Sequence, residues 1–80
     1  MTTNEKKWPI VELERLLSPS LGQEKACEVV GESARALGVW SDQITQQQAL
    51  AILERIASLS PGLIGITARF AKSQVVLRWN

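Results

Sequence analysis

The chain has 80 residues, and its composition narrows the classes of protein to which it can belong. Apolar residues make up 45% and charged residues 21%, which is typical of a globular domain rather than a disordered segment. The sequence has no histidine and one cysteine, Cys27, which removes the commonest general base, the commonest metal ligand and any internal disulfide. We therefore expect neither a cofactor nor a metal.

We expect a protein of the cytoplasm whose C-terminal third is modestly basic. The formal net charge is only +1, but no acidic side chain follows Glu54, while Arg55, Arg69, Lys72 and Arg78 make the last third basic. No apolar run approaches the roughly 20 residues needed to cross a bilayer, so we expect no membrane span. A single cysteine also fits a reducing compartment.

The N-terminal part predicts a tail followed by a short helix. Residues 1–7 are polar and are expected to form a flexible tail, with residues 8–80 forming a single helical domain. Pro9 suits the first turn of a helix, and Ile10, Leu13 and Leu17 share one face. We expect this helix over about 9–17, ending at Ser18-Pro19.

The second predicted helix covers about 21–37. Ser20 with Gln23 has the spacing of a capping box. In such a box the serine hydroxyl accepts the backbone amide of the glutamine, and the glutamine side chain accepts the backbone amide of the serine. A short connection follows and carries Trp40. We expect Trp40 to fold back on the core; an exposed Trp40 would instead be an anchor for a partner.

The most regular stretch predicts a central helix over 45–59. Its apolar residues fall within about half of a helical wheel, which a strand period of two cannot produce. Thr45 and Gln48 form a capping box, and Ser60-Pro61-Gly62 supplies the stop. The domain is expected to pack around this helix.

The second and central helices align at an offset of 23 residues, with Gln23 matching Gln46 and Ala26 matching Ala49. This similarity raises the alternative of an internal duplication. Two amphipathic helices with the same cap would align equally well, and two units are too few to define a repeat.

The last segment can be interpreted in two ways. Leu63, Ile66, Phe70 and Leu77 fit the apolar face of a helix over 63–77. The run from Val75 to Trp79 is β-branched and aromatic enough to form part of a strand, although a strand would need a partner. The fold prediction is a compact all-α domain of four helices, with the end of the fourth left open between helix and strand.

No motif for catalysis or ligand binding stands out, so we expect a protein that is not an enzyme. The last segment is apolar on more than one side, which a monomeric core does not easily cover, and tryptophan is enriched at binding hot spots. We expect a small regulatory or scaffolding adaptor that binds another protein, a second copy of itself, or both. The candidate partner-binding residues are Trp40, Arg69, Lys72, Arg78 and Trp79.

The alternative function is a small DNA-binding regulator. Two helices joined by Ser60-Pro61-Gly62 could form a helix-turn-helix. The polar residues of its second helix that could reach DNA are Thr67, Arg69, Lys72, Ser73 and Gln74. Against this, the sequence pI of about 7.9 lacks the strong positive charge usual for such domains.

Overall fold

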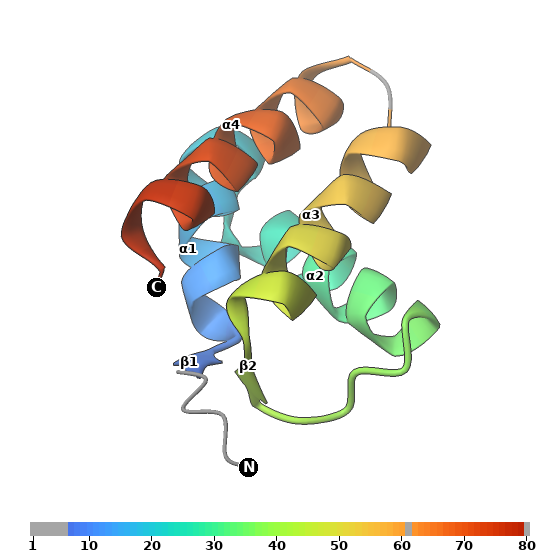
Figure 1. The fold of residues 1–80 in the computed structure, drawn as a ribbon. Coiled ribbons are helices and arrows are strands. Elements are labelled where there is room, and N and C mark those ends of the chain that lie inside the picture. Colours follow the sequence, from blue (N-terminus) through green and yellow to red (C-terminus); the bar gives the residue numbers. More distant parts are fainter. Residues whose placement is uncertain (1–6, 61, 80) are drawn as a thin grey trace, which may run out of the picture.

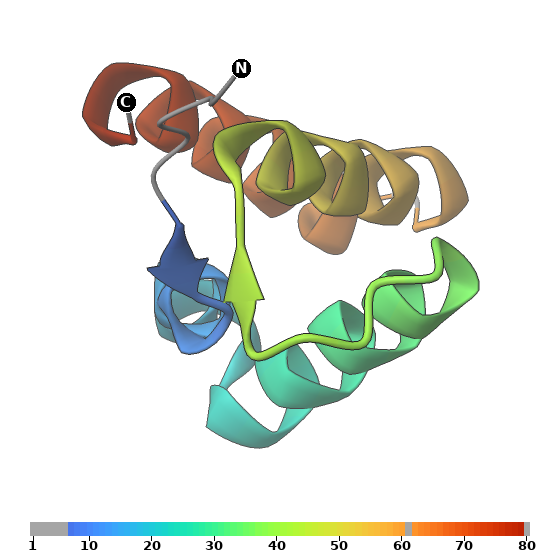
Figure 2. The same cartoon turned by 60° about the horizontal axis from the view of Figure 1, so that its bottom comes forward.

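The computed structural model describes residues 7–60 and 62–79, which form four helices and one short β-ladder. The helices are α1 (Val11–Leu21), α2 (Gln23–Ala36), α3 (Gln46–Leu59) and α4 (Leu63–Arg78), and the strands are β1 (Trp8–Pro9) and β2 (Gln43–Ile44). In Figure 1, α3 and α4 run side by side in opposite directions. Figure 2 shows them as one layer that covers α1 and α2. The predicted all-α, four-helix class is confirmed. The predicted flexible tail falls almost entirely outside the described residues.

The central helix α3 begins as its sequence predicts. The Thr45 hydroxyl accepts the amide of Gln48 at 3.2 Å, and the Gln48 side chain accepts the amide of Thr45 at 3.0 Å. This reciprocal pair satisfies two amides that the first turn leaves without helical partners. Ala49, Ile52, Leu53 and Ile56 form its buried face, as the wheel predicts.

Helix α1 differs from its prediction at both ends. It starts two residues later because Trp8 and Pro9 belong to a strand, and it runs past the expected stop at Ser18-Pro19. The Ser18 hydroxyl donates to the carbonyl of Glu14 at 2.7 Å, and the amide of Gly22 donates to the carbonyl of Ser18 at 2.7 Å. These bonds carry the helix through the proline, which cannot donate an amide hydrogen bond of its own.

The predicted cap of the second helix is wrong. Ser20 lies inside α1, and α2 starts only after Gly22, which has no side chain with which to cap the helix. Gly22 has φ +86°, a conformation that residues with a Cβ rarely adopt, so this one residue can end α1 and start α2. The sharp turn between the two helices is visible in Figure 2, where α1 is seen nearly end-on while α2 crosses the view.

The β-ladder is an element that the sequence did not indicate. Trp8 pairs with Ile44 and Pro9 with Gln43 in antiparallel register, and the amide of Ile10 donates to the carbonyl of Asp42 at 2.8 Å. Proline is tolerated here because a two-stranded ladder consists only of edge strands. The ladder therefore fixes the start of α1 beside Ile44, which directly precedes the α3 cap residue Thr45.

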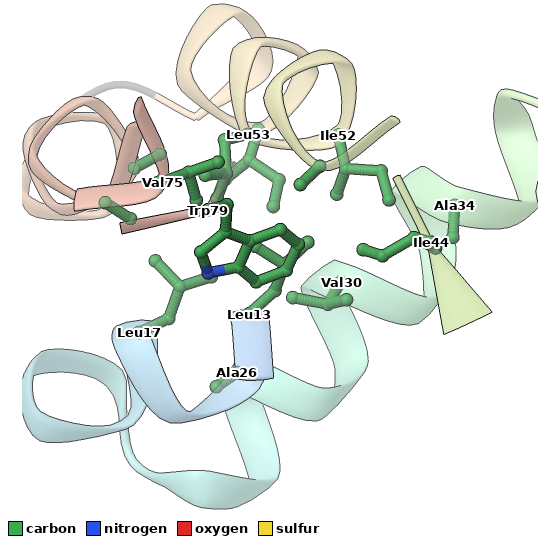
Figure 3. Close-up of a cluster of buried hydrophobic side chains, with 14 residues drawn as sticks. Leu13, Leu17, Ala26, Val30, Ala34, Ile44, Ile52, Leu53, Val75 and Trp79 are labelled. Atoms are coloured by element: carbon green, nitrogen blue, oxygen red, sulfur yellow. The ribbon is translucent and has the colours of Figure 1, made fainter. Parts of the chain in front are cut away.

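The core lies between the two helical layers. Figure 3 shows the ring of Trp79 among Leu13, Leu17 and Leu53, with Val30 and Ile44 on the far side. All five aliphatic residues are fully buried. Every helix contributes at least one buried side chain to this cluster, so the four helices share one core.

Helix α4 continues to Arg78, so the alternative of a strand from Val75 onward is wrong. Only Trp79, after the last helical turn, has an extended backbone. Within the described residues, no helix is long and apolar enough to cross a membrane.

Candidate protein-interaction surface

Helix α4 is apolar on two opposite sides, and the side with the smaller residues is the one packed into the protein. Its buried positions are Gly65, Thr67, Ala68, Ala71 and Val75. The larger side chains occupy the opposite half of the helix. The four residues predicted to share an apolar face of this helix do share one, but that face is exposed rather than packed into the core; they are Leu63, Ile66, Phe70 and Leu77.

The close packing at the start of α4 explains why small residues face inward. A Cβ added at Gly65 would collide with the carbonyl oxygen of Ser60 and would lie 3.4 Å from that of Ala57. Residue 65 must therefore lack a side chain for the helix to fold back against the end of α3. Ala68 and Ala71, one and two turns further on, are also buried, so the inward side of the helix is made of small side chains.

We call the exposed side of this helix the α4 outer face. Its apolar members are each more than half exposed: Phe70 is 64% exposed, Leu77 74% and Val76 55%. Together with the exposed polar residues Arg69 and Ser73, the face comprises Leu63, Ile66, Arg69, Phe70, Ser73, Val76 and Leu77. Figure 1 shows α4 at an outer edge of the helical array.

This apolar surface is comparable in size to the largest patch of a typical monomeric protein, a patch that is often functional. Five large side chains at this exposure present on the order of 500 Å², within the range of about 300–600 Å² for the largest patch of a typical monomer. Such patches, when rimmed by polar residues, mark sites of interaction with another molecule. Scattered single exposed apolar residues would carry no such implication.

Of the predicted site residues, Arg69 belongs to this face, Lys72 lines its flank, and Arg78 directly follows its last residue. Arg69 and Arg78 are exposed, and Lys72 is half-buried, with its amine 3.5 Å from the carboxylate of Glu54 on α3. A shallow hollow of about 550 Å³ on the flank of α4 is lined by Arg69, Lys72, Ser73, Val76 and Leu77. The apolar face is therefore edged by basic groups, and one of them is engaged by an acid of its own chain.

The other two predicted site residues are tryptophans, and the structure separates them from this face. Trp40 does not fold back on the core: it is 75% exposed, and Figures 1 and 2 place the segment connecting α2 to β2 well away from α4. Trp79 is only 5% exposed and stacks on Trp8. A buried ring is not available to a partner, so we remove Trp79 from the candidate surface.

Two further hollows in the described part of the chain are shallow and involve residues of α1 and α2. One of about 630 Å³ between α1 and α2 is lined mainly by Val11, Glu14, Arg15 and Pro19, with Ser18 and Gln23. In the described part of the chain, no group of three or more potential metal-ligating side chains comes together. Cys27 is exposed on α2, beside Glu24 and Glu28.

Sequence reasoning placed the large apolar residues of α4 on one face but did not establish that this face is exposed. The signal that could have indicated it is the row of small residues Gly65, Ala68 and Ala71, which share one arc with Val75. Small side chains allow two helices to approach closely, since the distance between helix axes depends on the residues at the contact. A comparison with protein-family models, curated proteins and solved structures finds no match to this chain.

Proposed function

We infer that the protein is a small interaction module, in a regulatory or scaffolding role, and that it binds another protein through the α4 outer face. The observation that supports this is the way α4 is oriented: its large apolar residues are exposed to solvent, while its small residues are buried in the core. Burying a leucine or phenylalanine side chain contributes about 1.5–3 kcal/mol, so leaving several exposed gives up stabilisation that a partner can recover.

The charge around the face favours an uncharged or acidic partner surface. Arg69 lies on the face and Arg78 beside its C-terminal end, and α4 itself has no acidic residue. Basic groups at the rim of an apolar patch contribute to partner choice and to the rate of association. The partner is another protein, a second copy of this chain, or both.

Nucleic acid is less well supported as the partner. The exposed side of α4 would have to be the recognition surface, and its centre is Ile66, Phe70 and Leu77 rather than polar groups. Thr67 is buried, and Lys72 is paired with Glu54. If the chain nevertheless binds random duplex DNA with a steep salt dependence, the protein-binding proposal is wrong.

We also propose a cytoplasmic location and a non-catalytic role. The location is supported by the lone, exposed thiol of Cys27, which suits a reducing compartment. The non-catalytic role is supported by the shallow hollows and by the lack of histidine in the sequence.

The test uses two glutamate substitutions at exposed apolar positions. Phe70→Glu places a charge at the centre of the face, whereas Val11→Glu is the matched control at the exposed start of α1. Wild-type and variant chains are immobilised and exposed to a lysate of the source organism and to the purified wild-type chain. Any protein retained is then purified, and its affinity for each variant is measured by calorimetry.

We expect Phe70→Glu to weaken the interaction at least about thirtyfold, as is typical of a hot-spot residue, and Val11→Glu to leave it within about twofold. Circular dichroism should show both variants folded, because both positions are exposed and glutamate favours helix. Binding that withstands Phe70→Glu would place the docking surface elsewhere.

A further inference from the structure

The α4 outer face carries a spacing that suits the pairing of two helices. Five of its residues are spaced alternately by three and four, which is the a and d spacing of a coiled-coil seam. These residues are Leu63, Ile66, Phe70, Ser73 and Leu77. The spacing matters because a partner helix that follows such a seam stays in contact with it over the full length of α4.

The core-facing side of α4 does not compete with this seam. Ala68, Ala71 and Val75 lie on the opposite side of the helix and are buried against the rest of the protein. The helix is already formed and held in place before any partner binds. A short seam can therefore suffice here, because the cost of ordering the helix, which makes short isolated helices marginal, has been met by the fold.

We propose that the occupant of the α4 outer face is the α4 outer face of a second copy, paired in parallel to form a two-fold symmetric dimer. This inference rests on the proposed function, since it uses the same face and names its partner. In the dimer each apolar position of the seam lies opposite the same residue of the second copy, so Ile66, Phe70 and Leu77 are buried against their own kind. The contact is self-complementary, as two-fold symmetry requires.

The parallel direction follows from the position of Arg69. With Leu63 and Leu77 at a positions, Arg69 occupies a g position and Gln74 the e position that follows it. In a parallel pair, Arg69 lies opposite Gln74 of the second copy, and its guanidinium can donate to that amide oxygen. In the antiparallel register that sets Phe70 opposite Ile66 of the second copy, Arg69 would instead lie close to Arg69 of the second copy, and like charges in juxtaposition are unfavourable.

The extent of apolar surface agrees with this arrangement. On the order of 500 Å² from each copy, together with the stems of Arg69 and Gln74, gives roughly 1,000–1,200 Å² in total. This is at the lower end of specific protein interfaces, where reversible association at micromolar concentration is expected.

The test is disulfide cross-linking at the one polar position of the seam. Ser73 is exposed, and in the proposed parallel pair it lies opposite Ser73 of the second copy. Because Cys27 is exposed and would cross-link by itself, the background is the full chain with Cys27→Ser. Ser73→Cys is compared with Ser58→Cys, an exposed position on α3 outside the face, under mild oxidation at micromolar concentration.

We expect Ser73→Cys to convert most of the chain to a disulfide dimer on a non-reducing gel, and Ser58→Cys to remain monomeric. Adding Phe70→Glu to Ser73→Cys should abolish the cross-link. Sedimentation equilibrium of the wild-type chain without oxidation should show a reversible dimer that Phe70→Glu dissociates.

The possible failures have different meanings. A wild-type chain that sediments as a monomer, but binds another purified protein in a way that Phe70→Glu prevents, overturns the dimer and leaves the proposed function standing. A dimer that Phe70→Glu dissociates, but that Ser73→Cys does not cross-link, overturns the parallel register alone. A dimer that is indifferent to Phe70→Glu overturns both proposals.

Discussion

The indole rings of Trp8 and Trp79 stack with their centroids 4.9 Å apart and their planes inclined by 20°. Trp8 belongs to β1 and Trp79 directly follows α4, so the stack connects the first and last elements of the described chain. Trp79 continues into the core between Leu13, Leu17 and Leu53 (Figure 3). The pair therefore holds the end of α4 against α1, and thereby fixes the orientation in which α4 presents its outer face.

Trp79→Ala should be among the most destabilising substitutions in the chain. Removing a buried tryptophan side chain costs about 3–5 kcal/mol, and a domain of this length has only roughly 4–12 kcal/mol of stability. Urea denaturation followed by circular dichroism should show most of the stability lost. Trp8→Ala, at a half-buried position, should cost about 1–2 kcal/mol, mainly the stacking and its partial burial.

A milder variant separates the energy of the ring stacking from the cost of the cavity that Trp79→Ala would leave. Trp79→Leu keeps much of the apolar volume, so a cycle of Trp8→Ala, Trp79→Leu and the double variant measures the coupling of the two rings. A coupling of about 0.5–1.5 kcal/mol is expected for an aromatic pair. Strictly additive effects would mean that the two rings do not interact in solution.

Thr45→Ala should remove one half of the capping box of α3. Losing such a cap costs about 1 kcal/mol, which corresponds to a fall of roughly 4–8 °C in the melting temperature of a domain of this size. Ser20→Ala is the matched control, because Ser20 has the same spacing to a glutamine but lies inside α1 and caps nothing in the described chain. Equal losses for the two variants would contradict the different starts of α2 and α3.

Comparison of the Thr45–Gln48 pair with the Ser20–Gln23 pair shows what the sequence can and cannot specify. A Ser or Thr followed three residues later by Gln is compatible with a capping box wherever it occurs, and at Thr45 the preceding β2 strand already brings the residue into an extended conformation. At Ser20 the preceding helix does not stop, because Ser18 stabilises the turn around Pro19. Local spacing is the same in both cases, and the conformation of the preceding segment decides the outcome.

The side of α4 that faces the core could not be predicted from the local sequence either, because it depends on the rest of the fold. Periodicity identifies an apolar arc, but α4 has two, and the pattern favours the one with the larger side chains. Which arc faces inward depends on the space that α1 and α3 leave, and that space accepts Ala68 and Ala71 but not Phe70. The β-ladder was missed because two residues on each side, one of them Pro9, give no strand signal.

Gly65→Ala should destabilise the protein although alanine favours helix by about 1 kcal/mol over glycine. The added Cβ meets the backbone oxygen of Ser60, which cannot move without shifting the turn into α4. Gly31→Ala in α2 is the control, because its Cβ would meet only the mobile guanidinium end of Arg35 at 3.8 Å. Thermal melts should move in opposite directions, down for Gly65→Ala and up for Gly31→Ala.

Adjacent valines provide the most direct test of which side of α4 is buried. Val75 is fully buried and Val76 is 55% exposed, although the two have the same side chain and the same helical backbone. Val75→Ala should cost about 1–3 kcal/mol through lost burial and the cavity left behind. Val76→Ala should be neutral or slightly stabilising in the monomer, because alanine is the better helix former.

Both valine variants are best measured in the Phe70→Glu background, where association through the outer face is removed and only folding is measured. Urea midpoints then report the stability of the monomer, provided that the slopes agree with that of the parent. In the chain without Phe70→Glu, Val76→Ala should instead weaken the dimer, since Val76 is part of the face that two copies share. A larger loss from Val76→Ala than from Val75→Ala in the monomer would mean that α4 is turned the other way, with its large side chains inside and no apolar surface left to bind a partner.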